Sequence, residues 1–285
     1  MKICFYDFCK ISALRKNARL KVATKILPGS GTMNLRQIFK QFIAGALFVL
    51  FAVICMIGNI LFIPIIVFRL NRFKAVENFA RDKVAVAWKF FIKMTEAFGY
   101  LEYKFDLKSE LNDGSQMIIA NHPSLLDVVF LVPKFKRINC IVKGSLSKNI
   151  FLFAAIRACN YIPNTQNDEL LQKSIEVLKN GENLLIFPEG TRTKDEIVFH
   201  KAAAYIAVKG AKSVSLLAIR MSPRSLKKDQ PWYKTPSVRI KYDFKEIFSL
   251  DMSKFMTHKP DLVRARRLHE DIIKIYKEEF DERAD

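Results

Sequence analysis

The chain has 285 residues, with 47 Lys or Arg against 28 Asp or Glu, which gives a net charge of +19 at neutral pH. This length can bury a substantial core in one large domain or two small ones, and the positive charge favours phosphate-bearing or acidic partners. Half of the residues are hydrophobic and 24 are Phe, more than a nucleic-acid-binding chain usually needs. The five Cys are scattered and odd in number, so we expect a reducing compartment and neither a disulfide framework nor a zinc site.

Residues 1–40 are basic, with nine Lys or Arg and a single acid, Asp7. The segment is too long and too polar for the charged start of an ordinary signal peptide. We therefore predict a disordered N-terminal extension. Met33 opens a short basic leader that runs straight into an apolar stretch. This pattern predicts that translation begins at Met33 and that residues 1–32 are absent from the native protein.

Residues 41–68 carry no charge over 28 positions. As one helix they would extend about 42 Å at ~1.5 Å per residue, more than the roughly 30 Å hydrocarbon core requires. We therefore predict a membrane segment, which Gly58-Asn59 and Pro64 divide into a full-length piece and a short piece. Both flanks are basic, so the positive-inside rule selects no orientation. A tilted span and a re-entrant helical hairpin with both ends cytoplasmic remain alternatives.

Residues 71–98 have the periodicity of an amphipathic helix. Apolar side chains recur at helical spacing with Lys and Arg among them. Basic residues beside Trp and Phe are typical of a helix at an anionic lipid surface, and the same pattern fits a helix packed on the domain. Residues 41–98 are thus assigned to a membrane segment and an interfacial helix. The apolar positions are Phe73, Val76, Phe79, Ala80, Val84, Ala87, Trp88 and Phe91.

From residue 99 to residue 285 the pattern is that of an α/β domain. Strand-like runs alternate with helical patterns, which predicts a mixed, partly parallel sheet with crossover helices, preceded by the membrane-embedded helix or helical hairpin. The predicted strands are Leu101–Phe105, Gln116–Ala120, Ile138–Val142, Asn160–Ile162, Asn183–Phe187, Val214–Ile219 and Val238–Tyr242. The predicted helices are Leu125–Val132, Ser145–Arg157, Asp168–Lys179, Lys201–Val208 and Pro260–Phe280.

A first polar motif, Asn-His-Pro-Ser-Leu-Leu-Asp over residues 121–127, lies between two apolar runs. We expect a strand that ends, turns at His122 and leads into a helix. A carboxylate such as Asp127 can fix the tautomer of His122 and support its charged form. The simpler interpretation is a helix start, with Ser124 as N-cap and Asp127 at the third helical position.

A second polar motif, Phe-Pro-Glu-Gly-Thr-Arg-Thr over residues 187–193, follows the apolar run Leu184–Phe187. Open α/β sheets bind ligands at the carboxyl ends of their strands. An Arg beside hydroxyl groups can bind a phosphate, so Arg192 and Thr191 are candidate ligand contacts. On its own the motif also fits a strand-end turn with an exposed Arg.

Together, and in this order, the two motifs strongly resemble those of the glycerolipid acyltransferase family, which contains the 1-acylglycerol-3-phosphate acyltransferases. The resemblance covers roughly residues 70–250. Lys143 resembles a lysine that the family carries after its first motif. The segment Phe199–Ala204 resembles a further family stretch, in which Lys201 supplies a cation.

The resemblance implies transfer of an acyl group from a thioester, acyl-ACP or acyl-CoA, to a hydroxyl, with no metal or other cofactor. His122 would be the general base and Asp127 would orient it and stabilise the imidazolium. No Ser or Cys nucleophile is needed. Contact between the two requires His122 to precede the helix or to lie in its first turn, because positions five apart on one helix differ by about 140°.

The resemblance also implies substrate-binding residues. Glu189, Gly190, Thr191 and Arg192 match the family's acceptor-binding motif, with Arg192 expected on an acceptor anion and Glu189 expected to hold the loop. Lys143 or backbone N–H groups would stabilise the oxyanion. The Phe-rich segments around Phe130, Phe135, Phe151 and Phe153 fit either an acyl tunnel or plain core.

The chain departs from the family pattern where the acceptor should bind. Ile162-Pro163-Asn164-Thr165 has no Arg at the place of the family's second-motif Arg, and Val214–Ile219 lacks the usual Pro. In the stretch at residues 199–204, His200 and Ala202 replace a Lys and a Gly. The default acceptor is 1-acylglycerol-3-phosphate, and a different lipid or carrier-bound hydroxyl is the alternative.

Other classes fit less of the sequence. A non-catalytic, basic lipid-binding protein of the membrane surface would explain the charge and the apolar segment, but not the two motifs. A lipid hydrolase would be expected to carry G-x-S-x-G, which the sequence lacks. No zinc-finger, helix-turn-helix or RRM signature points to nucleic acid. We expect the chain at the inner, cytoplasmic membrane, in contact with anionic lipid and with its catalytic domain facing the cytoplasm.

Overall fold

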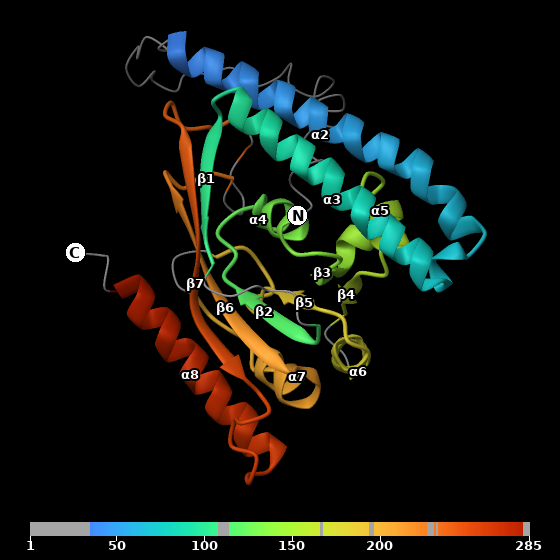
Figure 1. The fold of residues 1–285 in the computed structure, drawn as a ribbon. Helices are drawn as coiled ribbons and strands as arrows, with labels where there is room; N and C mark the ends of the chain where they lie inside the picture. The colour runs from blue at the N-terminus through green and yellow to red at the C-terminus, as the bar shows by residue number, and fades with distance from the viewer. Residues whose placement is uncertain are drawn as a thin grey trace, which may run out of the picture.

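The computed structural model describes residues 35–107, 114–165, 168–193, 197–226, 231 and 233–281 (Figure 1). The predicted start at Met33 lies outside these residues. So does the predicted extension up to residue 34. The first described helix, α2 (Leu35–Val67), begins six residues before the predicted membrane segment. Residues 35–40 are Leu, Arg, Gln, Ile, Phe and Lys, most of which favour helix, so the helix continues through them.

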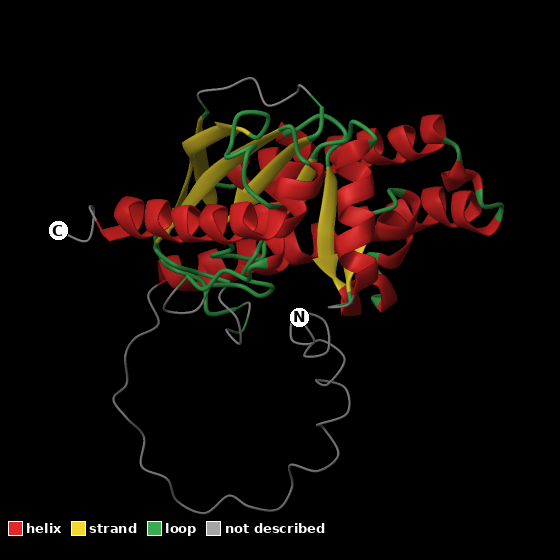
Figure 2. Ribbon diagram, turned by 90° about the horizontal axis from the view of Figure 1, so that it is seen from below, coloured by secondary structure: helices red, strands yellow, loops and turns green. Residues whose placement is uncertain are grey.

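The described strands form a seven-stranded sheet in the order β1-β7-β6-β2-β5-β3-β4. Figure 2 shows these strands in yellow among the red helices. Only β6 and β7 pair antiparallel, and the other neighbours pair parallel, which confirms the predicted mixed sheet. The strands are β1 (Leu101–Asp106), β2 (Gln116–Ala120), β3 (Asn139–Lys143), β4 (Ile162–Asn164), β5 (Leu184–Ile186), β6 (Ser213–Ser222) and β7 (Ile240–Asp251).

The central strand β2 explains why the sheet is covered on both faces. Its five residues are all buried, as expected for a parallel strand between two helical layers. Side chains alternate across a strand, so Ile118 and Ala120 join one hydrophobic core and Met117 and Ile119 join the other. The chain thus builds a three-layer domain, with β2 at its middle.

Helices cover both faces of the sheet (Figure 1). The hairpin helices α2 and α3 (Lys74–Ala97) pack with the short helices α4 and α5 over one face, and the remaining helices cover the other. Each crossover helix follows a strand, as the alternating pattern predicts. The crossover helices are α4 (Asp127–Lys134), α5 (Phe153–Ala158), α6 (Asp168–Lys179) and α7 (Ala202–Gly210). The last helix, α8 (Asp261–Asp281), follows β7.

The interruption predicted inside the apolar segment is wrong, because α2 is one helix from end to end. Pro64 removes a single backbone N–H close to the C-terminal end of a long helix, and the helix continues to Val67. Asn59 donates its side-chain amide to the Ile150 carbonyl at 2.6 Å, so it serves a tertiary contact rather than a turn. The chain reverses instead at Arg69, which has a φ of 55°, and at the 3-10 turn η2 (Leu70–Arg72) that leads into α3.

Two further predicted elements differ from what the sequence indicated, one in continuity and the other in position. The predicted helix Ser145–Arg157 is a 3-10 turn, η3 (Gly144–Lys148), followed by α5. Between them the Asn149 side chain accepts a hydrogen bond from the Phe151 N–H at 2.9 Å, which competes with helix formation. The strand predicted from Asn160 begins only at Ile162, because Asn160 is left-handed, with φ 50°.

Candidate active site

The first motif places a histidine and a carboxylate in contact at the carboxyl end of β2. The strand ends at Ala120, and His122 follows in irregular backbone before α4 begins at Asp127. His122 Nδ1 lies 2.7 Å from Asp127 Oδ2. The structure therefore brings the two residues together in the way that contact requires, with His122 ahead of the helix.

The predicted cap at Ser124 is corrected. The helix begins at Asp127 itself, and Ser124 makes no cap to it. The Ser124 hydroxyl instead accepts the Leu126 N–H at 3.0 Å and meets the Tyr242 hydroxyl at 2.6 Å, while the Ser124 N–H donates to Asp127 Oδ2 at 2.9 Å. Ser124 closes the turn between His122 and the helix because its hydroxyl bonds two residues ahead. The turn holds Asp127 below the imidazole.

Asp127 is completely buried, and burial raises the pKa of its carboxyl, although the hydrogen bond and charge of His122 oppose the rise. Its other oxygen, Oδ1, has no hydrogen-bond partner among the described residues. A buried carboxylate is costly unless it is paired. Asp127 Oδ2 accordingly has two partners, the His122 ring and the Ser124 N–H.

The second motif is bonded directly to the first. Glu189 Oε1 accepts the backbone N–H of His122 and the hydroxyl of Thr193, each at 2.7 Å. The Thr193 N–H in turn donates to the His122 carbonyl at 2.7 Å. Glu189 is buried, which raises the pKa of its carboxyl against the effect of these hydrogen bonds. Glu189 thus holds the loop, as the resemblance implied.

Gly190 permits the turn between Glu189 and the exposed Thr191. Its φ of 63° is one that other residues rarely adopt, while an added Cβ would find only the His200 ring at 3.7 Å. The preceding Phe187 packs its ring on that of His122, with centroids 4.4 Å apart. Phe187 was predicted only as the last residue of the strand Asn183–Phe187, whereas β5 ends at Ile186.

Other residues that support the turn were missed because their partners lie far away in sequence. Asn121 bonds both ways to Ile219, with its amide N–H donating to the carbonyl at 2.9 Å and its side-chain oxygen accepting the N–H at 2.7 Å. The Tyr276 hydroxyl from α8 lies 3.0 Å from the Ile119 carbonyl and 2.8 Å from that of Leu217. These contacts fix the end of β2 against β6 and α8.

A cavity of about 230 Å³ opens beside His122. At its polar end it is lined by Lys143 at the end of β3, Asn164 at the end of β4, and the segment Gly190–Arg192 after β5. The guanidinium of Arg192 donates to the Leu226 carbonyl at 2.6 Å. Lys201 lies at the start of α7 and does not line the cavity, so the structure does not bring it to the other predicted residues.

The rest of the cavity is apolar and lies under the helical hairpin. It is lined by Ala44, Leu47, Phe48 and Phe51 of α2, by Val84, Trp88, Phe91 and Thr95 of α3, and by Val128, Val129, Ala155 and Ile156 of α4 and α5. Of the Phe residues considered for an acyl tunnel, Phe130 and Phe135 are buried in the core and none of the four lines this cavity.

The described cysteines are buried, and burial raises the pKa of the Cys55, Cys140 and Cys159 thiols to about 12. A thiol of such pKa remains protonated at neutral pH and is a poor nucleophile. Among the residues that the structure describes, no group of three or more His, Cys, Asp or Glu side chains is placed to hold a metal ion.

Comparison with known proteins supports one family. A family model described as Acyltransferase matches residues 103–222. A curated relative, the chloroplastic 1-acyl-sn-glycerol-3-phosphate acyltransferase LPAT1 of Arabidopsis thaliana, is 29% identical over 39% of this chain. The match spans only 34% of that relative's length.

The crystal structure of PlsC, the 1-acyl-sn-glycerophosphate acyltransferase of Thermotoga maritima, has the same fold, with a TM-score of 0.59. It is 24% identical, and the alignment covers 87% of this chain and 99% of that one. The matched segment contains both polar motifs and the strands that place them. Residues 103–222 therefore match the Acyltransferase family model, and the chain resembles the 1-acylglycerol-3-phosphate acyltransferases.

Proposed function

We propose that the protein is a membrane-bound O-acyltransferase that moves a fatty acyl group from a thioester to the hydroxyl of a lysophospholipid, by default 1-acylglycerol-3-phosphate. One observation carries the proposal. His122, in contact with Asp127, lines the cavity in which a polar end joins an apolar interior. A reaction that joins a polar headgroup to an acyl chain needs such a junction.

In the proposed reaction His122 is the general base. Asp127 lies on Nδ1 and, as an acceptor, favours the tautomer with its proton there, which leaves Nε2 to take the proton of the acceptor hydroxyl. The hydroxyl oxygen then attacks the thioester carbonyl. The new C–O bond forms, the C–S bond breaks, and His122 returns the proton to the departing thiolate. Asp127 stabilises the imidazolium between these two steps.

The acceptor headgroup would bind at the polar end of the cavity. Arg192 and Lys143 line it from two different strand ends, and two such cations are suited to a phosphate. Asn164 lines the same end in register with Lys143 across the β3–β4 pair. A neutral side chain at this place favours the second candidate, the same chemistry on a different lipid hydroxyl or on a carrier-bound one.

The acyl chain of the donor would lie in the apolar part of the cavity, with its carbonyl at His122. Both acyl-ACP and acyl-CoA supply such a chain. Each is acidic and fits a protein with a net charge of +19. The fold and the charge do not favour one donor over the other, so the assay must include both.

The membrane contact would be made by the outer face of the hairpin. Among the described residues α2 is the one helix long and apolar enough to cross a bilayer. Its buried residues extend from Ile43 to Ile65, however, and pack on the domain along about 33 Å at ~1.5 Å per residue. Lys40 donates to the Gly99 carbonyl at 2.6 Å near one end and Asn59 to that of Ile150 towards the other.

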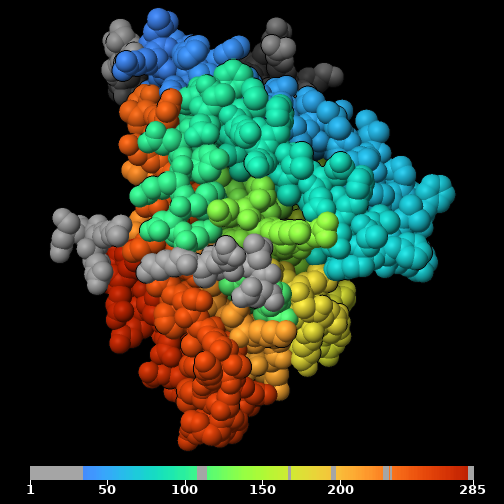
Figure 3. All heavy atoms as spheres, in the orientation of Figure 1, coloured from blue at the N-terminus to red at the C-terminus, as the bar shows by residue number. Residues whose placement is uncertain are grey.

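A helix that contacts the catalytic domain from Lys40 to Ile65 cannot be surrounded by lipid on all sides. We therefore favour a hairpin that lies in one leaflet of the cytoplasmic membrane, with the domain on the cytoplasmic side, over a tilted span. Figure 3 shows the atoms of the hairpin, in blue to turquoise, along one edge of the molecule. The outward side chains of α2 are apolar and exposed, as this placement requires. They include Leu35, Phe39, Phe42, Val49, Met56, Ile57, Ile60 and Val67.

The test is release of free thiol from acyl-ACP and acyl-CoA by membranes that contain the protein, with a panel of lysophospholipid and other hydroxyl acceptors. Removal of a general base should lower the acceptor-dependent rate by roughly 10²–10⁴-fold in His122→Ala. His258→Ala is the matched control, because His258 is exposed and outside the cavity. Equal rates in the wild type and His122→Ala would reject the proposal.

A further inference from the structure

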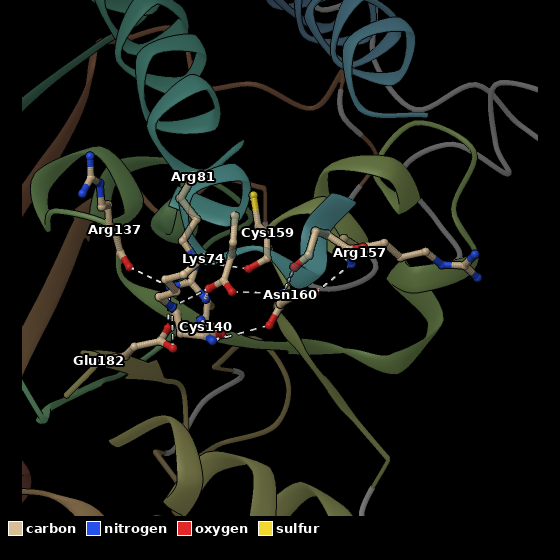
Figure 4. A network of polar contacts seen from close by, with 11 residues as sticks. Lys74, Arg81, Arg137, Cys140, Arg157, Cys159, Asn160 and Glu182 are labelled. Carbon is tan, nitrogen blue, oxygen red and sulfur yellow. Dashed lines mark hydrogen bonds and ion pairs between the residues drawn. The ribbon is translucent and has the colours of Figure 1, made fainter. Parts of the chain in front are cut away.

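Arg81, in the first half of α3, has only 2% of its surface exposed. A buried guanidinium must be paired to be tolerated, and this one has several polar partners (Figure 4). Its Nε donates to the Cys159 carbonyl at 3.0 Å and its Nη1 to the Arg137 carbonyl at 3.1 Å. Its two terminal nitrogens each lie 2.5 Å from a carboxylate, those of Glu77 and Glu182.

The partners of Arg81 have one topological feature in common. Arg137 precedes β3, Cys159 precedes β4 and Glu182 precedes β5, and these three strands are neighbours and parallel. Arg81 therefore joins α3 to the amino ends of three adjacent strands. The candidate catalytic residues lie at the opposite edge of the sheet, at the carboxyl ends of the parallel strands.

We call Arg81 and the groups that it contacts the latch. Lys74 and Asn160 make further contacts with the carboxylates of the latch. Lys74 Nζ lies 2.6 Å from Glu182 and 2.9 Å from Glu77. The Asn160 amide donates to Glu77 at 3.0 Å and to the Asn71 carbonyl at 2.9 Å. Burial tends to raise the pKa of Glu182, but Lys74 and Arg81 outweigh it and hold that pKa below its ordinary value. Two cations thus face two carboxylates.

The latch and the cavity lie on one seam of α3. Positions 77, 81, 84, 88, 91 and 95 are spaced alternately four and three apart, which puts them on one face of a helix. The first two carry the latch, and the last four line the cavity. Trp88 on this seam stacks on Phe51 of α2, with ring centroids 5.1 Å apart and 11° between the planes. The position of Arg81 therefore fixes the register of the cavity roof.

The latch also adjoins the cavity end that is farthest from His122. The lining of β3 runs from Ile141 to Lys143, and that of the β4 segment runs from Tyr161 to Asn164. Lys143 and Asn164 lie at the carboxyl ends of β3 and β4, beside the candidate catalytic motif. Ile141 and Tyr161 come earlier in these segments and therefore lie at the distal end of the cavity. Tyr161 follows directly on Cys159 and Asn160, which the latch binds.

We infer that Arg81 is a positioning residue that sets the distal end of the acyl cavity, and with it the acyl-chain length that the enzyme accepts. The inference rests on the proposed function. Replacement of a buried ion pair by apolar residues is often neutral or stabilising. A role in fixing geometry gives a reason for a buried Arg here that stability alone does not.

The test compares kcat/KM across a series of acyl thioesters from four to eighteen carbons, in the wild type, Arg81→Lys and Glu182→Gln. A four-carbon chain stays near His122, whereas a long chain reaches the seam. A misplacement of about 1 Å can cost a factor of 10². We therefore expect roughly a tenfold to hundredfold loss on the preferred long chain, a shift of the optimum, and less than about a threefold change on the shortest.

Asp82→Asn is the matched control. Asp82 is adjacent to Arg81 and forms an exposed ion pair with the Arg137 side chain at 2.9 Å, whereas Arg81 contacts only the Arg137 backbone carbonyl. Its length profile should match that of the wild type. Circular dichroism and thermal melts identify a variant that is simply unfolded, and Glu182→Gln keeps the test open if Arg81→Lys does not fold.

The outcomes are distinguishable. A uniform loss at every chain length in folded Arg81→Lys and Glu182→Gln would show a merely structural role and overturn the inference, as would unchanged profiles. A wild type that transfers no acyl group would instead contradict the proposed function. A changed length profile, with the four-carbon rate kept, would support the positioning role.

Discussion

Glu189 Oε1 accepts the backbone N–H of His122 at 2.7 Å, and the same oxygen accepts the Thr193 hydroxyl. The carboxylate of the second motif is therefore part of the backbone framework of the first. This contact explains why the two motifs occur together: the turn that carries His122 has no regular hydrogen-bond ladder of its own, and Glu189 supplies the missing acceptor.

We expect Glu189→Ala to be far more damaging than Glu189→Gln. A Gln oxygen can still accept from His122 and Thr193, whereas Ala leaves a buried N–H without its acceptor. Loss of a hydrogen bond to a charged group costs about 1.5–3 kcal/mol, or roughly a tenfold to hundredfold loss of kcat/KM if the turn shifts. Steady-state assays of the two variants measure the difference. Equal activities would show that Glu189 does not support the turn.

Asp127→Asn should lose activity. Its folding stability, measured relative to that of the wild type, should increase as the pH rises. Burial raises the pKa of Asp127, so the folded chain keeps a proton that the unfolded chain releases. Wild-type stability therefore falls as the pH rises from the unfolded pKa, about 3.9, through the raised folded pKa. Asn does not titrate and escapes this loss.

Thermal unfolding midpoints of the wild type and Asp127→Asn, taken at intervals between pH 4 and pH 8, test this. The expected result is a variant that gains on the wild type towards neutral pH, with activity lowered about 10²–10⁴-fold. A wild type that gained on the variant as the pH rose would contradict the assigned cost of burying Asp127.

The latch on α3 should respond to pH in the opposite sense. Lys74 and Arg81 depress the pKa of Glu182, so its contribution to stability is present above the unfolded pKa and is lost as the pH falls through the folded pKa. The difference in melting temperature between the wild type and Glu182→Gln should thus be largest near neutral pH and shrink in acid. A difference independent of pH would argue against ionised pairing in the latch.

Membrane association should depend on the outer face of the hairpin. Ile60 is 76% exposed on α2, and burial of one such side chain in lipid contributes about 1.5–3 kcal/mol. Ile60→Glu should therefore weaken binding to anionic vesicles by more than tenfold in sedimentation assays. Val238→Glu, at an exposed position before β7, makes the same change of charge and serves as the control. If both variants bound equally, the hairpin face would not be the contact.

The sequence predicted the elements whose signals are local. The helix Asp168–Lys179 has its predicted bounds, and the contact of His122 with Asp127 follows from five neighbouring residues. Both depend on periodicity and turn chemistry within a short window. The strand β7 is longer than predicted because its outer half, after Tyr242, is fixed by antiparallel pairing with β6.

The supporting residues had no such local signal. Arg81 was one more cation in an amphipathic helix, and only the loops before three strands explain its burial. Tyr276 meets Ile119 from 157 positions away. The Gly58-Asn59 pair suggested a break because its composition is typical of turns, while in the fold Asn59 bonds to Ile150 and the helix continues. Such roles depend on tertiary partners that composition does not identify.

The central claim is best tested by the product itself. Purified wild type in anionic vesicles, given an acyl thioester and 1-acylglycerol-3-phosphate, should form the diacyl ester, detected by mass spectrometry as the acceptor plus one acyl group. His122→Ala should form it roughly 10²–10⁴-fold more slowly. Equal rates of ester formation in the two proteins, or release of free fatty acid without any new ester on any acceptor, would contradict acyl transfer by His122.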